Sequence, residues 1–114
     1  MNVNAITLNI SDMSESMFFY QELLGFDLIY GGTESSFSTL KLSDTFINLN
    51  VMNTPIPTGW GRFIVHVFDV DQFYEKLKYT DVPIENPPMN ASWGERYIHI
   101  LDPDGHALSL ATPI

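Results

Sequence analysis

The sequence runs twice through the same order of patterns, and this repeat limits the fold more than any other feature. Residues 3–10 alternate apolar and polar side chains as a half-buried strand does, and Asp12 then begins a run with helical spacing that ends at Gly25. An apolar strand pattern over 62–68 and a second helix start at Asp69 repeat this beginning. The repeat predicts two βαβββ modules, and therefore an α+β fold.

Further strand patterns follow each predicted helix. The predicted elements are strands at 26–30, 37–42 and 46–52, then a helix ending near Tyr79, a short strand at 82–84, a Pro-rich loop at 85–93, and strands at 96–101 and 107–111. We expect one domain, with module one at 1–53, a linker rich in proline and glycine at 54–61, and module two at 62–114. Neither half alone could bury its sheet face, so the halves must pair, within the chain or across a dimer.

The composition excludes several classes of partner. Lys and Arg number 5 and Asp and Glu number 14, for a net charge of −9, which disfavours nucleic acid and anionic membrane surfaces and favours a cationic small molecule. The absence of cysteine excludes thiol nucleophiles, disulfides and cysteine-ligated zinc. No apolar run approaches the roughly 20 residues of a membrane span, and no signal peptide is evident. We expect a cytoplasmic protein.

The two-residue period of a strand assigns side chains to two faces of each predicted sheet. One face is apolar, and we expect it to pack under the helices; it comprises Ile6, Leu8, Ile10, Ile47, Leu49, Val51, Phe63, Val65, Val67, Ile98, Ile100, Leu108 and Leu110. The other face mixes amides, hydroxyls, imidazoles and a guanidinium with aromatic rings. With two loop tryptophans added, it gives the candidate ligand-binding residues Thr7, Asn9, Phe46, Asn48, Asn50, Trp60, Arg62, Ile64, His66, Trp93, Tyr97, His99 and Ser109.

Two strings in the sequence resemble those of the vicinal oxygen chelate superfamily, which contains glyoxalase I, bleomycin-resistance proteins and extradiol dioxygenases. The first runs from Ile10 to Phe26 and includes Phe19-Tyr20 and Leu24-Gly25-Phe26. The second contains Trp93-Gly94 and Asp102-Pro103-Asp104-Gly105-His106. The resemblance covers essentially the whole chain. It implies that the two modules form a cup-shaped mixed sheet with helices on the outer face, and a homodimer.

The resemblance also assigns four positions to metal ligands, and here they are Ala5, Asn48, Arg62 and Ser109. Ala5 has no donor atom, Asn48 and Ser109 are neutral, and Arg62 is a permanent cation. These residues predict no metal and no other cofactor, and in this they are closest in character to the metal-free bleomycin-resistance proteins. A site built from His66 and His99 is an alternative.

Four candidate residues carry alternative interpretations. His99 is either a general acid or base, or a polar residue bonded to Asn48, Ser109 or Tyr97. Arg62 either anchors a carboxylate or phosphate of a ligand, or pairs with Glu95 or another carboxylate at a dimer seam. Trp60 and Trp93 either stack on a flat ligand or close the ends of the cup. Of the other histidines, we expect His66 near the rim and His106 in solvent.

The function predicted from the sequence is metal-independent binding of a small molecule. The protein would sequester an aromatic or cationic compound in a cup at a dimer interface, as bleomycin-resistance proteins do. One alternative is an enzyme of the superfamily, such as a lyase, isomerase or dioxygenase, that uses His99 and Arg62 or an atypical metal site. A second alternative is a protein-interaction module whose ligand site is degenerate.

Overall fold

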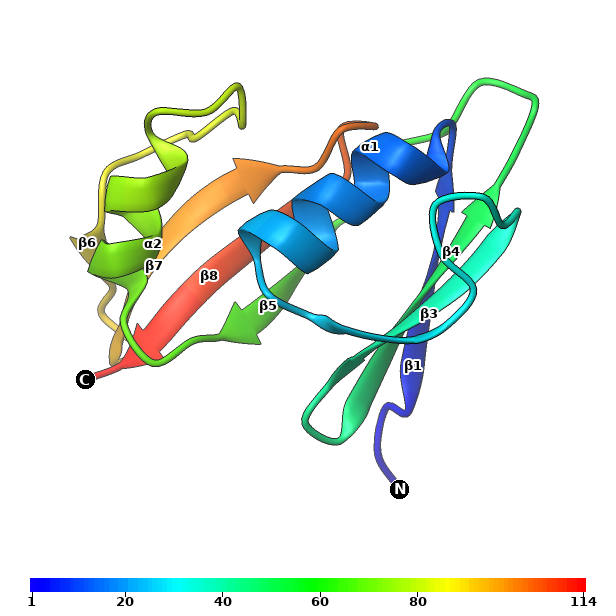
Figure 1. The fold of residues 1–114 in the computed structure, drawn as a ribbon. Helices are drawn as coiled ribbons and strands as arrows, with labels where there is room; N and C mark the ends of the chain where they lie inside the picture. The colour runs from blue at the N-terminus through cyan, green and yellow to red at the C-terminus, as the bar shows by residue number, and fades with distance from the viewer. The chain divides into compact units, whose positions relative to one another are not determined.

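The computed structural model describes residues 1–114 as two compact units, Met1–Ile56 and Pro57–Ile114. Each unit is a βαβββ module with a four-stranded mixed sheet, which confirms the predicted α+β class (Figure 1). The boundary between the units falls inside the segment expected to be a linker. No helix in the chain combines the length and the apolar character that crossing a membrane requires.

The first unit contains β1 (Ala5–Ile10), α1 (Met13–Met17), η1 (Phe18–Leu23), β2 (Asp27–Tyr30), β3 (Phe37–Leu42) and β4 (Thr45–Val51). Its strand order is β1-β4-β3-β2, with β1 parallel to β4 and the other pairs antiparallel. The Asp12 carboxylate accepts a hydrogen bond of 3.0 Å from the Glu15 amide, so the predicted helix start is confirmed. Gly25 ends the helical segment with φ of 81°, as predicted.

The second unit contains β5 (Arg62–His66), α2 (Val70–Leu77), β6 (Met89–Asn90), β7 (Glu95–Leu101) and β8 (Ala107–Pro113). Its strand order is β5-β8-β7-β6, and β5 runs parallel to β8 (Figure 1). The Asp69 carboxylate accepts from the amides of Asp71 and Gln72 and begins α2 where the sequence predicts it.

Each sheet buries the face that the strand alternation predicts to be apolar. In the first unit α1 contacts β4, and in the second α2 contacts β7 and β8. The strand residues of this face with at most 2% exposure are Leu8, Ile10, Leu40, Ile47, Leu49, Ile98, Ile100, Leu108, Leu110 and the small residue Ser38. The small residues Ser109 and Ala111 are equally buried but lie on the opposite face of β8. The larger side chains of the opposite face stay partly or fully exposed, and they form what we call the open face of each sheet.

The structure departs from the predicted elements in three places. The predicted strand at 82–84 forms only a single bridge between Ile84 and Ile100, because Pro83 lacks an amide proton and interrupts the ladder. The strand that pairs with β7 here is β6, two residues inside the predicted Pro-rich loop. In the first helix, residues 18–23 form a π-helix, with the Leu24 amide bonded to the Phe19 carbonyl at 3.0 Å. Other boundaries differ by one or two residues.

Candidate functional site

The open face of the first sheet is a network of amides and hydroxyls. Thr7, Asn48 and Thr39 form one row across β1, β4 and β3. The Asn48 side chain accepts from the Thr39 hydroxyl at 2.7 Å and donates to the Thr7 hydroxyl at 3.2 Å. These bonds hold the Asn48 amide in one orientation. The side chain is half-buried, so the network presents polar atoms rather than a closed core.

A second row on this face joins the remaining asparagines. Asn50 donates to Asn9 Oδ1 at 3.2 Å and lies 3.4 Å from Met52 Sδ. Phe46, on the other side of the Asn48 row, pairs with Ala5 in the register of the parallel strands. The structure therefore brings together the five candidate residues of the first unit, from Thr7 to Asn50, on one face of one sheet.

The open face of the second sheet places six candidate residues together: Arg62, Ile64, His66, Tyr97, His99 and Ser109. Ile64, Ser109 and His99 form one row across β5, β8 and β7. His66 and Tyr97 flank Ala111 in the next row. The Ile64 side chain is 55% exposed, so this face offers an apolar surface between polar groups.

Three of these residues form a hydrogen-bonded chain. Arg62 Nη1 donates to Ser109 Oγ at 3.1 Å, and Ser109 Oγ lies 2.7 Å from His99 Nδ1. Burial of the imidazole, and then the nearby Arg62 charge, lower the pKa of His99 below its ordinary value of 6.5, while Glu85 opposes the shift. Of the partners weighed for His99, the structure therefore shows a hydrogen bond to Ser109.

A carboxylate joins two other candidate residues. Glu95 Oε2 pairs with His66 Nε2, and Glu95 Oε1 accepts from the Trp93 indole N–H at 2.8 Å. The hydrogen bond from His66, followed by that from Trp93, lowers the pKa of Glu95 below its ordinary value. Within the chain Glu95 is thus paired with His66, and a pairing of Arg62 with a carboxylate at a dimer seam stays a prediction.

Three rings follow one another along this face. The Trp93 ring stacks on Tyr97 with centroids 5.9 Å apart and an interplanar angle of 27°, and the centroids of Tyr97 and His99 lie 4.7 Å apart. Trp93 remains 67% exposed, so one side of its indole faces solvent. An aromatic surface of this kind can stack on a flat molecule.

Trp60 lies apart from these rings. Its ring is parallel to that of Phe63, a residue of the opposite strand face, with centroids 6.5 Å apart. Its indole N–H donates to His106 Nδ1 at 2.9 Å. His106 is 3% exposed, so the expectation that it lies in solvent is wrong. The Asp102 carboxylate accepts from the His106 amide at 2.8 Å, and the Trp60 indole gives the buried imidazole a partner.

The residues at the four family metal positions do not fit a metal. Ala5 offers a methyl group, Asn48 is bonded to two threonines, and Arg62 donates to Ser109. A guanidinium in the first shell of a cation is electrostatically unfavourable. No group of three His, Asp or Glu side chains is arranged to hold a metal ion.

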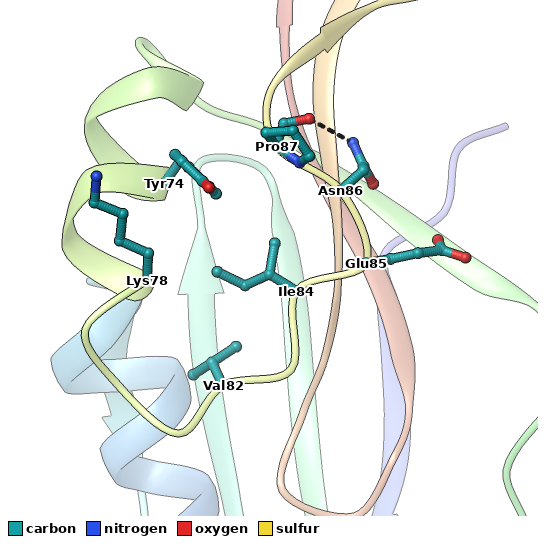
Figure 2. A pocket seen from close by; sticks show the side chains of 7 residues that line it. All are labelled: Tyr74, Lys78, Val82, Ile84, Glu85, Asn86 and Pro87. Atoms are coloured by element: carbon teal, nitrogen blue, oxygen red, sulfur yellow. Dashed lines mark hydrogen bonds between the residues drawn. The ribbon is translucent and has the colours of Figure 1, made fainter.

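A separate shallow pocket of about 310 Å³ lies on the helix side of the second sheet. It is lined by Tyr74 of α2, by Lys78 directly after α2, and by Val82, Ile84, Glu85, Asn86 and Pro87 (Figure 2). The Lys78 ammonium is paired with Glu75 at 2.7 Å. This pocket contains none of the candidate residues.

The sequence reasoning missed three residues that support the open faces. Thr39 follows the same alternation over 37–42, so that pattern could have identified it. The sequence indicates Glu95 only as a partner of Arg62. Asn86 lies in an irregular segment and accepts from the His99 amide at 3.1 Å, and no sequence pattern marks that contact.

Comparison with known proteins gives the family. The model of the Glyoxalase/Bleomycin resistance protein/Dioxygenase superfamily matches residues 2–110. No curated protein matches the chain. Among solved structures, the antibiotic binding protein TnmS3 from Streptomyces sp. CB03234 is 28% identical with a TM-score of 0.80, and the match covers 100% of this chain and 97% of TnmS3.

Two further structures share the fold. TioX from Micromonospora sp. ML1 is 18% identical with a TM-score of 0.79, and the match covers 100% of both chains. A superfamily member from Sphaerobacter thermophilus DSM 20745 is 23% identical with a TM-score of 0.78, and the match covers 98% of this chain and 97% of the other. With the family model matched over nearly its whole length, the chain belongs to the Glyoxalase/Bleomycin resistance protein/Dioxygenase superfamily.

Proposed function

We propose that this chain is a metal-independent binding protein that sequesters a small aromatic molecule on the open face of its second sheet. The observation that carries the proposal is the run of rings from Trp93 through Tyr97 to His99, beside an exposed Ile64. Stacking between aromatic rings adds about 0.5–1.5 kcal/mol beyond the burial of area. The likeness to TnmS3, an antibiotic binding protein, supports the same class of function.

The test is calorimetric titration with a panel of two- and three-ring compounds, namely naphthalene, quinoline and acridine derivatives. Tyr97→Ala removes the central ring and should weaken binding about threefold to tenfold. Tyr79→Ala is the matched control, because Tyr79 is an 83% exposed tyrosine just beyond α2 and outside this face. Dissociation constants above about 1 mM for every compound in the panel would contradict the proposal.

Metal independence is part of the proposal, and the donor set at Ala5, Asn48, Arg62 and Ser109 supports it. Elemental analysis of the purified protein, followed by titration with Zn²⁺, Ni²⁺, Mn²⁺ and Fe²⁺, tests it. We expect no retained metal and no tight binding. One tightly held metal per chain would favour an enzyme instead, and His66→Ala and His99→Ala would then identify its ligands.

We also propose that the protein acts as a homodimer, and that a second copy helps to enclose the ligand. Exposed apolar side chains such as Ile64 and Met89 support this, since their burial would favour association. Sedimentation velocity tests the oligomeric state, with the protein at concentrations of 1–100 times the dissociation constant of the best ligand in the panel. A monomer that still binds the ligand would contradict the dimeric site.

A further inference from the structure

We propose that the ligand of the second sheet carries an anionic oxygen, such as an aromatic carboxylate, which Arg62 and His99 bind beside the ring resting on Tyr97. This inference rests on the proposed function and names its ligand class. The net charge of −9 favours a cationic ligand, whereas the Arg62 guanidinium on the open face favours an anionic one. We expect the nearby guanidinium to decide the charge of the ligand.

The donor inventory fixes the direction of the Arg62–Ser109 hydrogen bond and allows the Ser109 hydroxyl to donate to His99. A guanidinium can only donate, so Arg62 donates to Ser109 Oγ. Ser109 is 2% exposed and has a single hydroxyl proton, and His99 Nδ1 at 2.7 Å is positioned to accept it. The neutral imidazole then carries its own proton on Nε2. In this arrangement the other nitrogen of His99 is a donor to a ligand.

The donors on this part of the face have no carboxylate partner. The ion pairs of the second unit join His66 to Glu95, Lys78 to Glu75 and Arg96 to Asp71, and none includes Arg62. Arg62 is exposed and uses one of its five N–H groups on Ser109. Glu85 also acts on His99, but its effect is smaller than that of Arg62. The site therefore offers unused positive charge to a ligand.

The order of residues along the strands gives the face a polarity. Glu95, Tyr97 and His99 follow one another on β7, and Arg62 lies next to Ile64 on β5 at the His99 end. The carboxylate of Glu95 lies at the opposite end and is bonded to His66 and Trp93. A planar ring over Tyr97 and Ile64 would direct an anionic substituent toward Arg62. The charges of the face match a ligand that is aromatic at one end and anionic at the other.

Three probes with the same rings separate the possibilities: 2-naphthoate, 2-naphthalenemethanol and 2-naphthylmethylammonium, titrated at pH 7.5. Naphthoate should bind about tenfold more tightly than the alcohol, because hydrogen bonds to charged groups are stronger than neutral ones. Arg62→Met should remove this preference. Arg96→Met is the matched control: Arg96 is the only other arginine and is bonded to Asp71, so the preference should persist.

The outcomes distinguish this inference from the proposed function. If the alcohol or the ammonium binds as tightly as naphthoate, the anionic ligand is wrong and aromatic binding stands. If all three dissociation constants exceed about 1 mM, both the anionic ligand and the proposed aromatic binding are wrong. Nitrogen-15 NMR of His99 in the free protein gives an independent check. We expect a proton on Nε2 that depends on Ser109, and a proton on Nδ1 would overturn the inference.

Discussion

The Ser109 hydroxyl oxygen lies 2.7 Å from Nδ1 of His99 and accepts a hydrogen bond from Arg62 at 3.1 Å. Ser109→Ala removes both bonds from a residue that is 2% exposed. Arg62 can turn to water, whereas the half-buried His99 loses its hydrogen-bond partner. The free energy of unfolding should fall by about 1–2 kcal/mol, as measured by urea denaturation. An unchanged midpoint would show that the chain of bonds does not stabilise the sheet.

The lowered pKa of His99 predicts a pH dependence of stability. The unfolded imidazole, with a pKa near 6.5, takes up a proton at pH values where the folded one remains neutral. The unfolded state therefore binds more protons, and stability falls as the pH falls through 6.5 toward the folded pKa. Urea unfolding of the protein and of His99→Gln between pH 8 and 5.5 checks this. Their difference in stability should shrink with falling pH, and a constant difference would contradict the shift.

The sequence predicts most of the fold because local signals and the tertiary structure agree. Asp12 and Asp69 cap their helices, and the strand alternation identifies the buried face of each sheet. The failures arise where local pattern is uninformative. Six residues cannot distinguish a π-helix from an α-helix by spacing. The contact of Pro83 and Met89 with β7 depends on an irregular segment rather than on a strand pattern.

The candidate site shows the same division. Strand parity places Arg62, His99 and Ser109 on one face, and their hydrogen bonds are a direct consequence of the register. The strand alternation gives no information about loop residues. It could not indicate that Trp60 bonds to His106 whereas Trp93 bonds to Glu95. The burial of His106 was missed for this reason.

Two fully buried serines in the first unit should respond oppositely to replacement by alanine. Ser16 lies in α1 at 0% exposure, and its hydroxyl has no hydrogen-bond partner. Ser16→Ala should raise the free energy of unfolding by about 0.5–1 kcal/mol, because it removes a buried polar atom and favours the helix.

Ser38 provides the matched control. It is also 0% exposed, but its hydroxyl accepts from the Gly32 amide at 2.9 Å and donates to the Gly32 carbonyl at 3.3 Å. Ser38→Ala should cost about 1–3 kcal/mol. Urea denaturation of both variants checks the pair, and a loss of stability in Ser16→Ala would indicate an unseen partner for that hydroxyl.

Two glycines with nearly the same positive φ should differ in their tolerance of alanine. Gly25 has φ of 81° and Gly31 has φ of 82°, so both replacements are strained by about 1–2 kcal/mol. A Cβ at Gly25 meets nothing within 4 Å, whereas one at Gly31 would lie 2.4 Å from the Phe37 carbonyl oxygen. Gly31→Ala should therefore cost at least about 3 kcal/mol. Thermal unfolding compares them, and equal losses would contradict the close approach at Gly31.

The two tryptophans should contribute unequally to stability, although each donates its indole N–H to a side chain. Trp60→Phe removes the donor to the Nδ1 atom of His106, a residue that is 3% exposed, and keeps a ring against Phe63. We expect a loss of about 1 kcal/mol. In Trp93→Phe, Glu95 keeps its bond to His66 and the ring site is largely in solvent, so the change should stay within about 0.5 kcal/mol. Urea unfolding followed by circular dichroism avoids the altered fluorescence. Equal losses of unfolding free energy in the two variants would contradict the larger contribution expected from the buried bond to His106.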